Sequence, residues 1–500
     1  MERDASIPID ANTMLDSSTS IDANTTLDSS TPLDANATFD SSAPPDAAPT
    51  LDASTPIDSG TSLDAAVAMD AGGPMCALPL VCPSSSPIDV AWLRAPRSGR
   101  GRPGAVALDA EGGVVVAGVY RSALDVDGET LPLSGAADFY VVRYRADGTV
   151  AWRVRGATTN DDLSLVAAAF GPDGRVYLAG AGAGALDFGG GVVPEPPAPG
   201  LRPAFVVALA SDGAFLWAAR FPELGAESFA LDPAGTPILL GKFTTSVTIP
   251  GVGALSGLGS GADLALVSLD PATGAARSAL VVGEPARNEF SGVVAAGPDG
   301  DLYAAGAFIE AGGAGDRGLW LQRMSPEGTV RWRRREAALP DYPTSQVIDL
   351  AVTSTGDAIL LADAWVDLGT GPLTPFWVAR FRAADGATAW ATRDVAGQRL
   401  TLSADRIAVA NTWSVSPLVS LTPCAFTASG SGLALLELDL EGRLRAFGAI
   451  PLSAAPTAIA LRASRLALAG TANAALTLPC ADSPVSADSP FVATFTLPGG

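Results

Sequence analysis

From about Ile88 to the C-terminus, short apolar runs alternate with turn residues, and the same order of runs returns roughly every 60 residues. In each copy a first apolar run meets a tight turn, and a second run then ends in a small residue, as in LVAAAFGPDGRVYLAG at 165–180. A variable loop leads to a third run and a second turn, as in DFYVVRYRADG at 138–148, and a fourth run follows. Short apolar runs bounded by Gly, Asp and Pro predict β-strands, so each copy predicts four antiparallel strands.

The fourth run of each copy carries one large aromatic or aliphatic residue. Seven such marker residues occur, so the chain contains seven copies. A single four-stranded unit cannot bury both of its faces, so the copies must pack on one another. Closing them into a ring leaves only short protected edges. We therefore predict an all-β fold, a seven-bladed β-propeller of four-stranded antiparallel blades over residues 88–500, with the marker residues packed in the blade cores. The markers are Trp92, Trp152, Trp217, Leu280, Trp332, Trp390 and Phe447.

The two ends of the repeat region complement each other. The seventh copy stops after its third run, at about Leu497, whereas residues 90–94 form an orphan run of the fourth type. We expect 90–94 to complete the last blade and thereby to fasten the two ends of the ring. Copies six and seven lack the first glycine turn and are the least regular.

Residues 1–75 carry a different pattern, in which Asp recurs every six residues from Asp4 to Asp70. An apolar residue usually precedes the Asp, and Ser, Thr, Ala, Asn and Pro fill most other positions. One apolar side chain per six residues offsets little of the ordering cost of about 1–2 kcal/mol per residue. We predict a disordered acidic tether that acts as a spacer, followed by a short Cys-containing linker at 76–87. A left-handed β-helix is the alternative, against which Pro45 occupies one of the apolar positions.

The composition excludes several kinds of chemistry. The chain has a formal net charge of −22, no histidine, and Lys242 as its only lysine. Catalytic triads with His and His-ligated metals are thereby excluded, and the acidity argues against nucleic acid as a partner. The dense basic segment 331–335 falls in a predicted outermost strand, where charge protects a sheet edge; a binding patch is the alternative. No apolar stretch approaches the about 18 residues needed to span a bilayer.

Four cysteines, Cys76, Cys82, Cys424 and Cys480, form no CxxC pair. A sparse, even set favours disulfides in an oxidising compartment, with free buried thiols as the alternative. Cys424 and Cys480 occupy matching loops of copies six and seven and could be bridged, while Cys76 and Cys82 could close a small loop. The first ten residues hold no apolar signal-peptide core. We expect an extracellular or surface protein, with a lipoprotein anchor as one form, whose export signal lies upstream of Met1; the alternative is a cytoplasmic protein.

The repeats resemble a known family. The shared pattern is a turn-linked strand pair ending in Val/Leu-Ala-Gly, then an Asp-Phe-Val-like strand, Asp-Gly and Trp. In these features residues 88–500 are similar to the bacterial β-propeller repeat family of the SBBP-like type, found in surface and secreted proteins. The resemblance implies an extracellular or cell-surface protein, and the family usually has no assigned activity.

Few residues point to a site. Asn160, Asp161 and Asp162 cluster carboxylates beside a predicted inner strand, but no DxDxDG pattern appears, so a solvated loop is favoured over Ca²⁺. We assign no catalytic, cofactor-binding or metal-binding residue. The chain is therefore expected to be a secreted or cell-surface, non-enzymatic monomer that binds an unidentified protein or glycan of the cell envelope. The alternative is a propeller hydrolase or lyase with carboxylates and a divalent metal at its central channel.

Overall fold

The chain divides into two units, Met1–Ala68 and Met69–Gly500, and the second contains every residue that the structure describes. The predicted tether at 1–75, with its β-helix alternative, lies outside the described residues. The computed structural model describes residues 76–77, 88–160, 162–194, 202–259, 261–285, 287–310, 317–339, 345–393, 395, 397–404, 406–414, 418–421, 424–427, 431–450, 454–472, 485 and 487–498.

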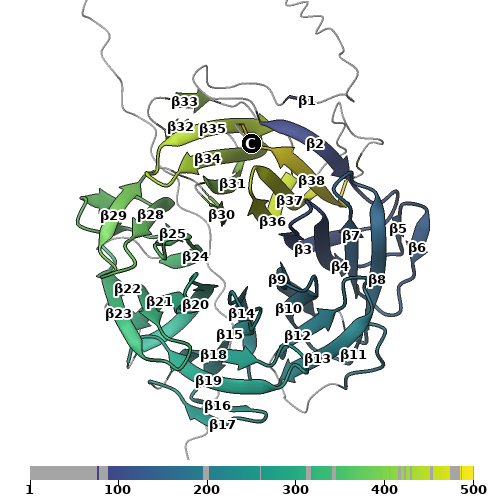
Figure 1. Ribbon diagram of the computed structural model, residues 1–500, viewed down its shortest axis with the longest axis horizontal. Helices are drawn as coiled ribbons and strands as arrows, with labels where there is room; N and C mark the ends of the chain where they lie inside the picture. The colour runs from purple at the N-terminus through teal and green to yellow at the C-terminus, as the bar shows by residue number, and fades with distance from the viewer. Residues whose placement is uncertain are drawn as a thin grey trace, which may run out of the picture. The chain divides into compact units, whose positions relative to one another are not determined.

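Seven four-stranded antiparallel sheets surround a central axis and form a seven-bladed β-propeller, which confirms the predicted fold (Figure 1). In the first six blades the order of the strands in the sheet follows their order in the chain, whereas in blade 7 the early strand β2 takes the fourth place. The first strand of each blade lies nearest the axis, and the fourth lies at the rim. No helix among the described residues has the length and apolar character needed to cross a membrane.

The first four blades have these strands. Blade 1 contains β3 (Gly101–Leu108), β4 (Val114–Tyr120), β7 (Asp138–Tyr144) and β8 (Val150–Thr158). Blade 2 contains β9 (Leu163–Phe170), β10 (Val176–Gly182), β12 (Ala204–Leu209) and β13 (Phe215–Phe221). Blade 3 contains β14 (Gly225–Leu231), β15 (Pro237–Thr244), β18 (Ala262–Leu269) and β19 (Ala276–Val282). Blade 4 contains β20 (Arg287–Ala296), β21 (Leu302–Glu310), β22 (Arg317–Met324) and β23 (Val330–Ala337).

The last three blades follow the same plan. Blade 5 contains β24 (Gln346–Val352), β25 (Ala358–Asp363), β28 (Trp377–Phe381) and β29 (Thr388–Thr392). Blade 6 contains β30 (Arg399–Ser403), β31 (Arg406–Ser414), β34 (Ser431–Asp439) and β35 (Leu444–Ile450). Blade 7 contains β36 (Ala454–Arg462), β37 (Arg465–Ala472), β38 (Pro490–Thr496) and β2 (Asp89–Arg94).

The ring is closed by strands from its two ends. β2 pairs antiparallel with β38, with Trp92 opposite Thr494 and Leu93 opposite Ala493. In Figure 1 the purple β2 therefore lies beside the yellow strands of blade 7. This pairing is the one expected for residues 90–94. On its outer side β2 pairs with a further short strand, β1 (Cys76–Ala77).

The core lies between neighbouring blades. One apolar cluster combines Val115 and Phe139 of blade 1 with Leu178 and Phe205 of blade 2, all four side chains being fully buried. Each blade is thus covered on both faces by its neighbours, which is why its middle strands are near-continuous apolar runs. Burying one such side chain stabilises the fold by about 1.5–3 kcal/mol.

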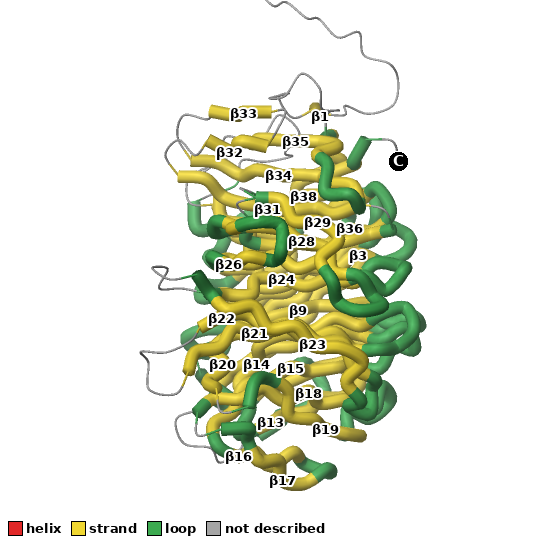
Figure 2. The backbone as a smooth tube through the Cα atoms, turned by 90° about the vertical axis from the view of Figure 1, so that its left-hand side faces the viewer, coloured by secondary structure: helices red, strands yellow, loops and turns green. Residues whose placement is uncertain are grey.

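The two ends of the ring differ. Tight turns, such as 109–113 and 145–149, join the first to the second strand and the third to the fourth; we call this side the turn end. The opposite side, the loop end, carries the longer connections between second and third strands, such as 121–137 and 183–203, and the links between blades. Figure 2 shows the ring from the side, with its connections at the two ends of the strands. Gly148 in one tight turn has a φ of +82°, a conformation that explains the recurrent Asp-Gly step.

The long connections contain regular hairpins that the sequence pattern did not reveal. β5 (Leu124–Val126) pairs with β6 (Glu129–Leu131), β16 (Ser246–Ile249) with β17 (Gly253–Ser256), β26 (Val366–Asp367) with β27 (Pro372–Leu373), and β32 (Leu418–Leu421) with β33 (Cys424–Thr427). Leu124, Val247 and Val366 of these hairpins are fully buried and join the apolar clusters between adjacent blades. Blades diverge outward from the axis, so side chains of this kind fill the widening gap near the rim.

Candidate functional site

The marker tryptophans bind the next blade along the ring. Each Nε1–H donates a hydrogen bond to one main-chain carbonyl in the turn between the third and fourth strands of that blade, which we call the seam carbonyl. The indole also packs on the positive-φ glycine of the same turn, such as Gly148 beneath Trp92. The bonds are Trp92 to Ala146 (2.9 Å), Trp152 to Ser211 (2.8 Å), Trp217 to Pro271 (3.0 Å), Trp332 to Ala383 (2.7 Å) and Trp390 to Leu440 (2.6 Å).

In five blades an arginine of the same blade donates to the same seam carbonyl, and in blade 6 Arg406 donates to the carbonyl of Pro498, which follows β38 of blade 7. A carbonyl oxygen has two lone pairs and can accept both donors. Three of these arginines lie on third strands. Arg406 and Arg465 begin second strands, and Arg175 immediately precedes one. The contacts are Arg143 to Ser211 (2.9 Å), Arg323 to Ala383 (2.8 Å), Arg380 to Leu440 (2.8 Å), Arg175 to Pro271 (2.7 Å), Arg465 to Ala146 (3.2 Å) and Arg406 to Pro498 (2.8 Å).

The basic segment 331–335 lies on β23, the outermost strand of blade 4, where the sequence placed it. Its arginines have partners within the protein. Arg333 donates two hydrogen bonds to Oε1 of Gln322 (2.9 and 2.6 Å), and Arg334 donates to Oγ1 of Thr388 in blade 5 (2.8 Å). The guanidinium of Arg335 lies 4.9 Å from the ring centre of Phe308. These contacts give the segment a structural role at the sheet edge.

The carboxylate cluster of the sequence falls in the link between blades 1 and 2. Oδ1 of Asn160 accepts the backbone N–H of Asp162 (2.9 Å), and the exposed carboxylate of Asp162 pairs with Arg202 (2.8 Å). Asp161 lies outside the described residues. Within the described part of the chain, no group of three or more Cys, Asp or Glu side chains could hold a metal ion.

The cysteines are only partly covered by the structure. The backbone of Cys76 lies in β1 and that of Cys424 in β33. Cys82 and Cys480 lie outside the described residues, so the disulfide pairing stays a prediction.

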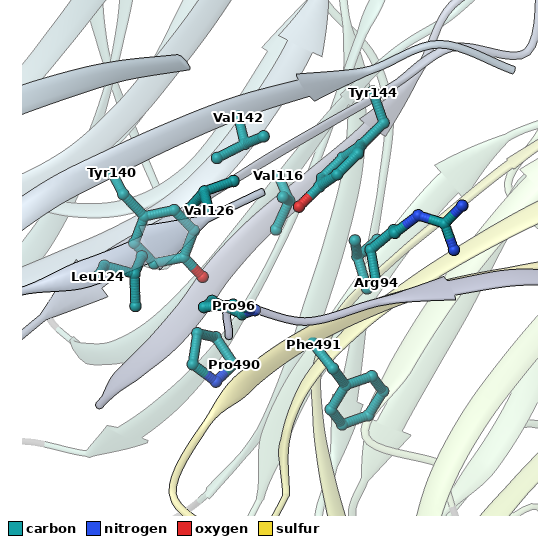
Figure 3. Close-up of a pocket in the computed structure, with 11 residues that line it drawn as sticks. Arg94, Pro96, Val116, Leu124, Val126, Tyr140, Val142, Tyr144, Pro490 and Phe491 are labelled. Carbon is teal, nitrogen blue, oxygen red and sulfur yellow. The ribbon is translucent and has the colours of Figure 1, made fainter. Parts of the chain in front are cut away.

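A small cleft lies where the ring closes, between blades 7 and 1. Figure 3 shows the hydroxyl groups of Tyr140 and Tyr144 pointing into the space between the labelled side chains. Burial raises the pKa of both phenols, and Oη of Tyr140 is buried with no hydrogen-bond partner among the described residues. The lining residues are Arg94, Pro96, Val116, Leu124, Val126, Tyr140, Val142, Tyr144, Pro490, Phe491 and Val492. This apolar lining belongs to the core that seals the ring.

The most unusual chemistry lies between blades 3 and 4 at the loop end, at a site that we call the acidic seam: Asp263, Glu284 and Glu289. The side chains of Asp263 and Glu289 are fully buried. The backbone N–H of Glu284 donates to Oε1 of Glu289 (2.6 Å), whereas Oε2 of Glu289 has no hydrogen-bond partner among the described residues. The carboxylate of Glu284 lies within 3.9 Å of Arg333 and 4.0 Å of Arg335.

Burial keeps Glu289 protonated at neutral pH. It raises the pKa of this carboxyl from 4.5 to about 8; the bond from the Glu284 N–H opposes the rise, and the charges of Asp263 and Glu284 add to it. Burial also raises the pKa of Asp263, and the backbone N–H groups of Leu258 and Gly259 oppose this rise. A carboxylic acid that stays neutral near pH 7 can donate a hydrogen bond or a proton.

Sequence reasoning missed Glu289, although the repeats contain a signal for it. Glu289 pairs with Phe308, two residues after Gly306. In three other blades the glycine at the place of Gly306 is Gly118, Gly180 or Gly470. The residues that pair with the second residue after these glycines cannot ionise: they are Gly101, Leu163 and Ala454. An ionisable group at a position that is otherwise small or apolar suggests a role other than packing.

Comparison with known proteins assigns the chain to no family. No protein-family model and no curated protein matches the sequence. A catalytically inactive virginiamycin B lyase from Staphylococcus aureus, solved with quinupristin, is similar at 10% identity and a TM-score of 0.43, over 81% of this chain and 99% of that one. A protein of unknown function from Dyadobacter fermentans matches at 11% identity and a TM-score of 0.40, over 83% and 100% of the two chains. An ulvan lyase, a polysaccharide lyase, matches at 9% identity and a TM-score of 0.42, over 76% and 93%.

Proposed function

We propose that this protein is a secreted or cell-surface, non-enzymatic propeller that binds a protein or glycan of the cell envelope through its loop end. The observation that carries the proposal is the difference between the two ends of the ring. The turn end is built from tight turns held by the seam carbonyls. The loop end bears longer connections, which vary in length from blade to blade, on a rigid scaffold, an arrangement that suits recognition. The resemblance of the repeats to surface propellers supports the location.

The proposal is tested by measuring binding of the purified full chain to envelope fractions and to a glycan array. Charge reversal at the loop end, Arg97→Glu with Arg202→Glu, is expected to weaken binding at least tenfold. Both side chains are exposed, at 64% and 42%. The matched control reverses charges at the turn end, Asp173→Lys with Asp385→Lys, at 50% and 56% exposure, and should bind as the wild type does. Equal loss in both pairs, or no binding to any envelope component, contradicts the proposal.

Location is tested separately on intact cells. Protease added outside the cells is expected to degrade the protein while a cytoplasmic marker survives. Survival of the protein until the cells are lysed would contradict a surface location.

A further inference from the structure

The seam between blades 3 and 4 lacks the contacts that join the other seams at the turn end. Leu280 stands where five other blades carry a tryptophan, so no indole N–H reaches the turn of blade 4. Thr236 and Ser268 occupy the two positions that supply an arginine elsewhere. Between blades 6 and 7, where Phe447 replaces the tryptophan, Arg406 still binds the carbonyl of Pro498 (2.8 Å). The seam between blades 3 and 4 therefore has neither donor.

We propose that the ring opens at the seam between blades 3 and 4, and that loss of the proton on Glu289 drives this opening. The seam combines missing contacts at the turn end with a buried carboxyl at the loop end. The contacts that hold it closed include an apolar cluster with Leu240, Leu264 and Trp320, and hydrogen bonds between the two blades. Oδ1 of Asn288 accepts the N–H of Ala262 (3.1 Å), and the N–H of Val294 donates to Oγ of Ser228 (3.2 Å).

Among the residues that the structure describes, no cation forms an ion pair with Glu289. Its strand, β20, packs against β14, β15 and β18 of blade 3, β21 of its own blade, and β24 of blade 5. The carboxylates nearest to it, Asp263 on β18 and Glu284 in the link between the blades, have the same sign of charge. The same strands carry five other charged residues. Glu227 and Lys242 pair with each other at 3.2 Å, and Oδ2 of Asp349 accepts the N–H of Leu400. Arg287 stacks on Phe308, and Glu310 is the residue opposite Arg287 in the sheet.

The sign of the pH effect follows from the position of the proton. In the closed seam the pKa of Glu289 is about 8, whereas exposure to water returns it towards its ordinary value of 4.5. Between these values the closed form keeps a proton that the open form has lost, so rising pH favours opening. The closed seam is most stable below about pH 4.5 and loses this contribution as the pH rises through about 8.

The test is hydrogen exchange of the full chain between pH 6 and pH 9, with each rate divided by the intrinsic rate at that pH. We expect opening of β19 and β20 to increase at least about tenfold in the wild type over this range. β8 and β9, at the seam between blades 1 and 2, should show no such increase and serve as the internal control. Glu289→Leu, which places an apolar residue there as in blade 2, should remove the increase, and Glu289→Gln is a second variant should the first fail to fold. Glu227→Gln should retain it.

A gain-of-contact variant tests the other half of the proposal. Leu280→Trp restores an indole beside Gly328, whose turn has the same positive φ as the turns that receive a tryptophan. We expect it to slow exchange of β19 and β20 at every pH. The proposal is overturned by an equal pH response in wild type and both Glu289 variants, by a response of the same size at β8 and β9, or by no response at all. Unchanged exchange in Leu280→Trp would overturn the claim that the missing contacts weaken this seam.

Discussion

The indole nitrogen of Trp217 in blade 2 lies 3.0 Å from the carbonyl oxygen of Pro271 in blade 3, and the ring packs on Gly274 of the same turn. Nη1 of Arg175, also in blade 2, donates to the same oxygen at 2.7 Å. One carbonyl thus joins two blades through two side chains. This contact recurs around the ring, so its energy can be measured in one blade and compared with the blade that lacks it.

Replacing Trp217 with Phe should lower the free energy of unfolding by about 1–2 kcal/mol, because a ring remains but the hydrogen bond is lost. The measurement is the urea midpoint of the purified chain. Leu216→Ala on the same strand is the control: Leu216 is 41% exposed, and its replacement should change stability by less than about 0.5 kcal/mol. Equal effects of the two substitutions would show that the hydrogen bond of Trp217 does not stabilise the protein.

Two glycines separate the cost of backbone conformation from the cost of crowding. Gly369 has a φ of +86° and open space around a Cβ, so Gly369→Ala should cost about 1–2 kcal/mol from the left-handed conformation alone. Gly386 has a φ of +69°, and a Cβ there would lie 2.6 Å from the ring of Trp332. Gly386→Ala should therefore cost at least about 1 kcal/mol more, which thermal unfolding can resolve. Equal costs would mean that the ring moves aside freely.

Two tyrosines of blade 1 test the value of a buried hydroxyl. Oη of Tyr120 donates to the carbonyl of Pro132 (2.8 Å), so Tyr120→Phe should destabilise the protein by about 1 kcal/mol. Tyr140 has a buried hydroxyl without a partner among the described residues, so Tyr140→Phe should be neutral or stabilising. Both variants are compared with the wild type by chemical denaturation. A large loss in Tyr140→Phe would reveal a partner for its hydroxyl, such as a water bound in the cleft of Figure 3.

Asp349 should make stability fall with rising pH in the acid range. Burial raises its pKa from 3.8 to about 6, although Oδ2 accepts the N–H of Leu400 from blade 6 (3.0 Å). The folded state therefore keeps a proton between these values that the unfolded chain has lost, and this contribution disappears as the pH rises to about 6. Asp349→Asn should flatten the fall in the urea midpoint between pH 4 and pH 6. The exposed Glu111→Gln should leave the fall unchanged, and an unchanged slope in Asp349→Asn would contradict the assignment.

Local chemistry in the sequence was enough to predict the blades. The Asp-Gly turns require positive φ at defined places, and the apolar runs between them have the length of strands, so blade number and strand order follow from the chain itself. The orphan run at 90–94 was identified as the closing strand by the same reasoning, because the last copy lacks its fourth strand. Each of these features depends on residues close together in the sequence or on a count of copies.

The contacts between blades were decided only by the tertiary structure. That Trp217 bonds with Pro271, or that Leu124 fills the gap between blades 7 and 1, depends on the angle at which neighbouring sheets meet, and the sequence pattern does not contain this angle. Glu289 shows the same limit. In the sequence it is one acidic residue among other polar ones, and the unusual pKa arises because blade 3 covers it and places Asp263 and Glu284 beside it. Burial and the nearest charges belong to the packed ring, so they determine its chemistry where composition and spacing cannot.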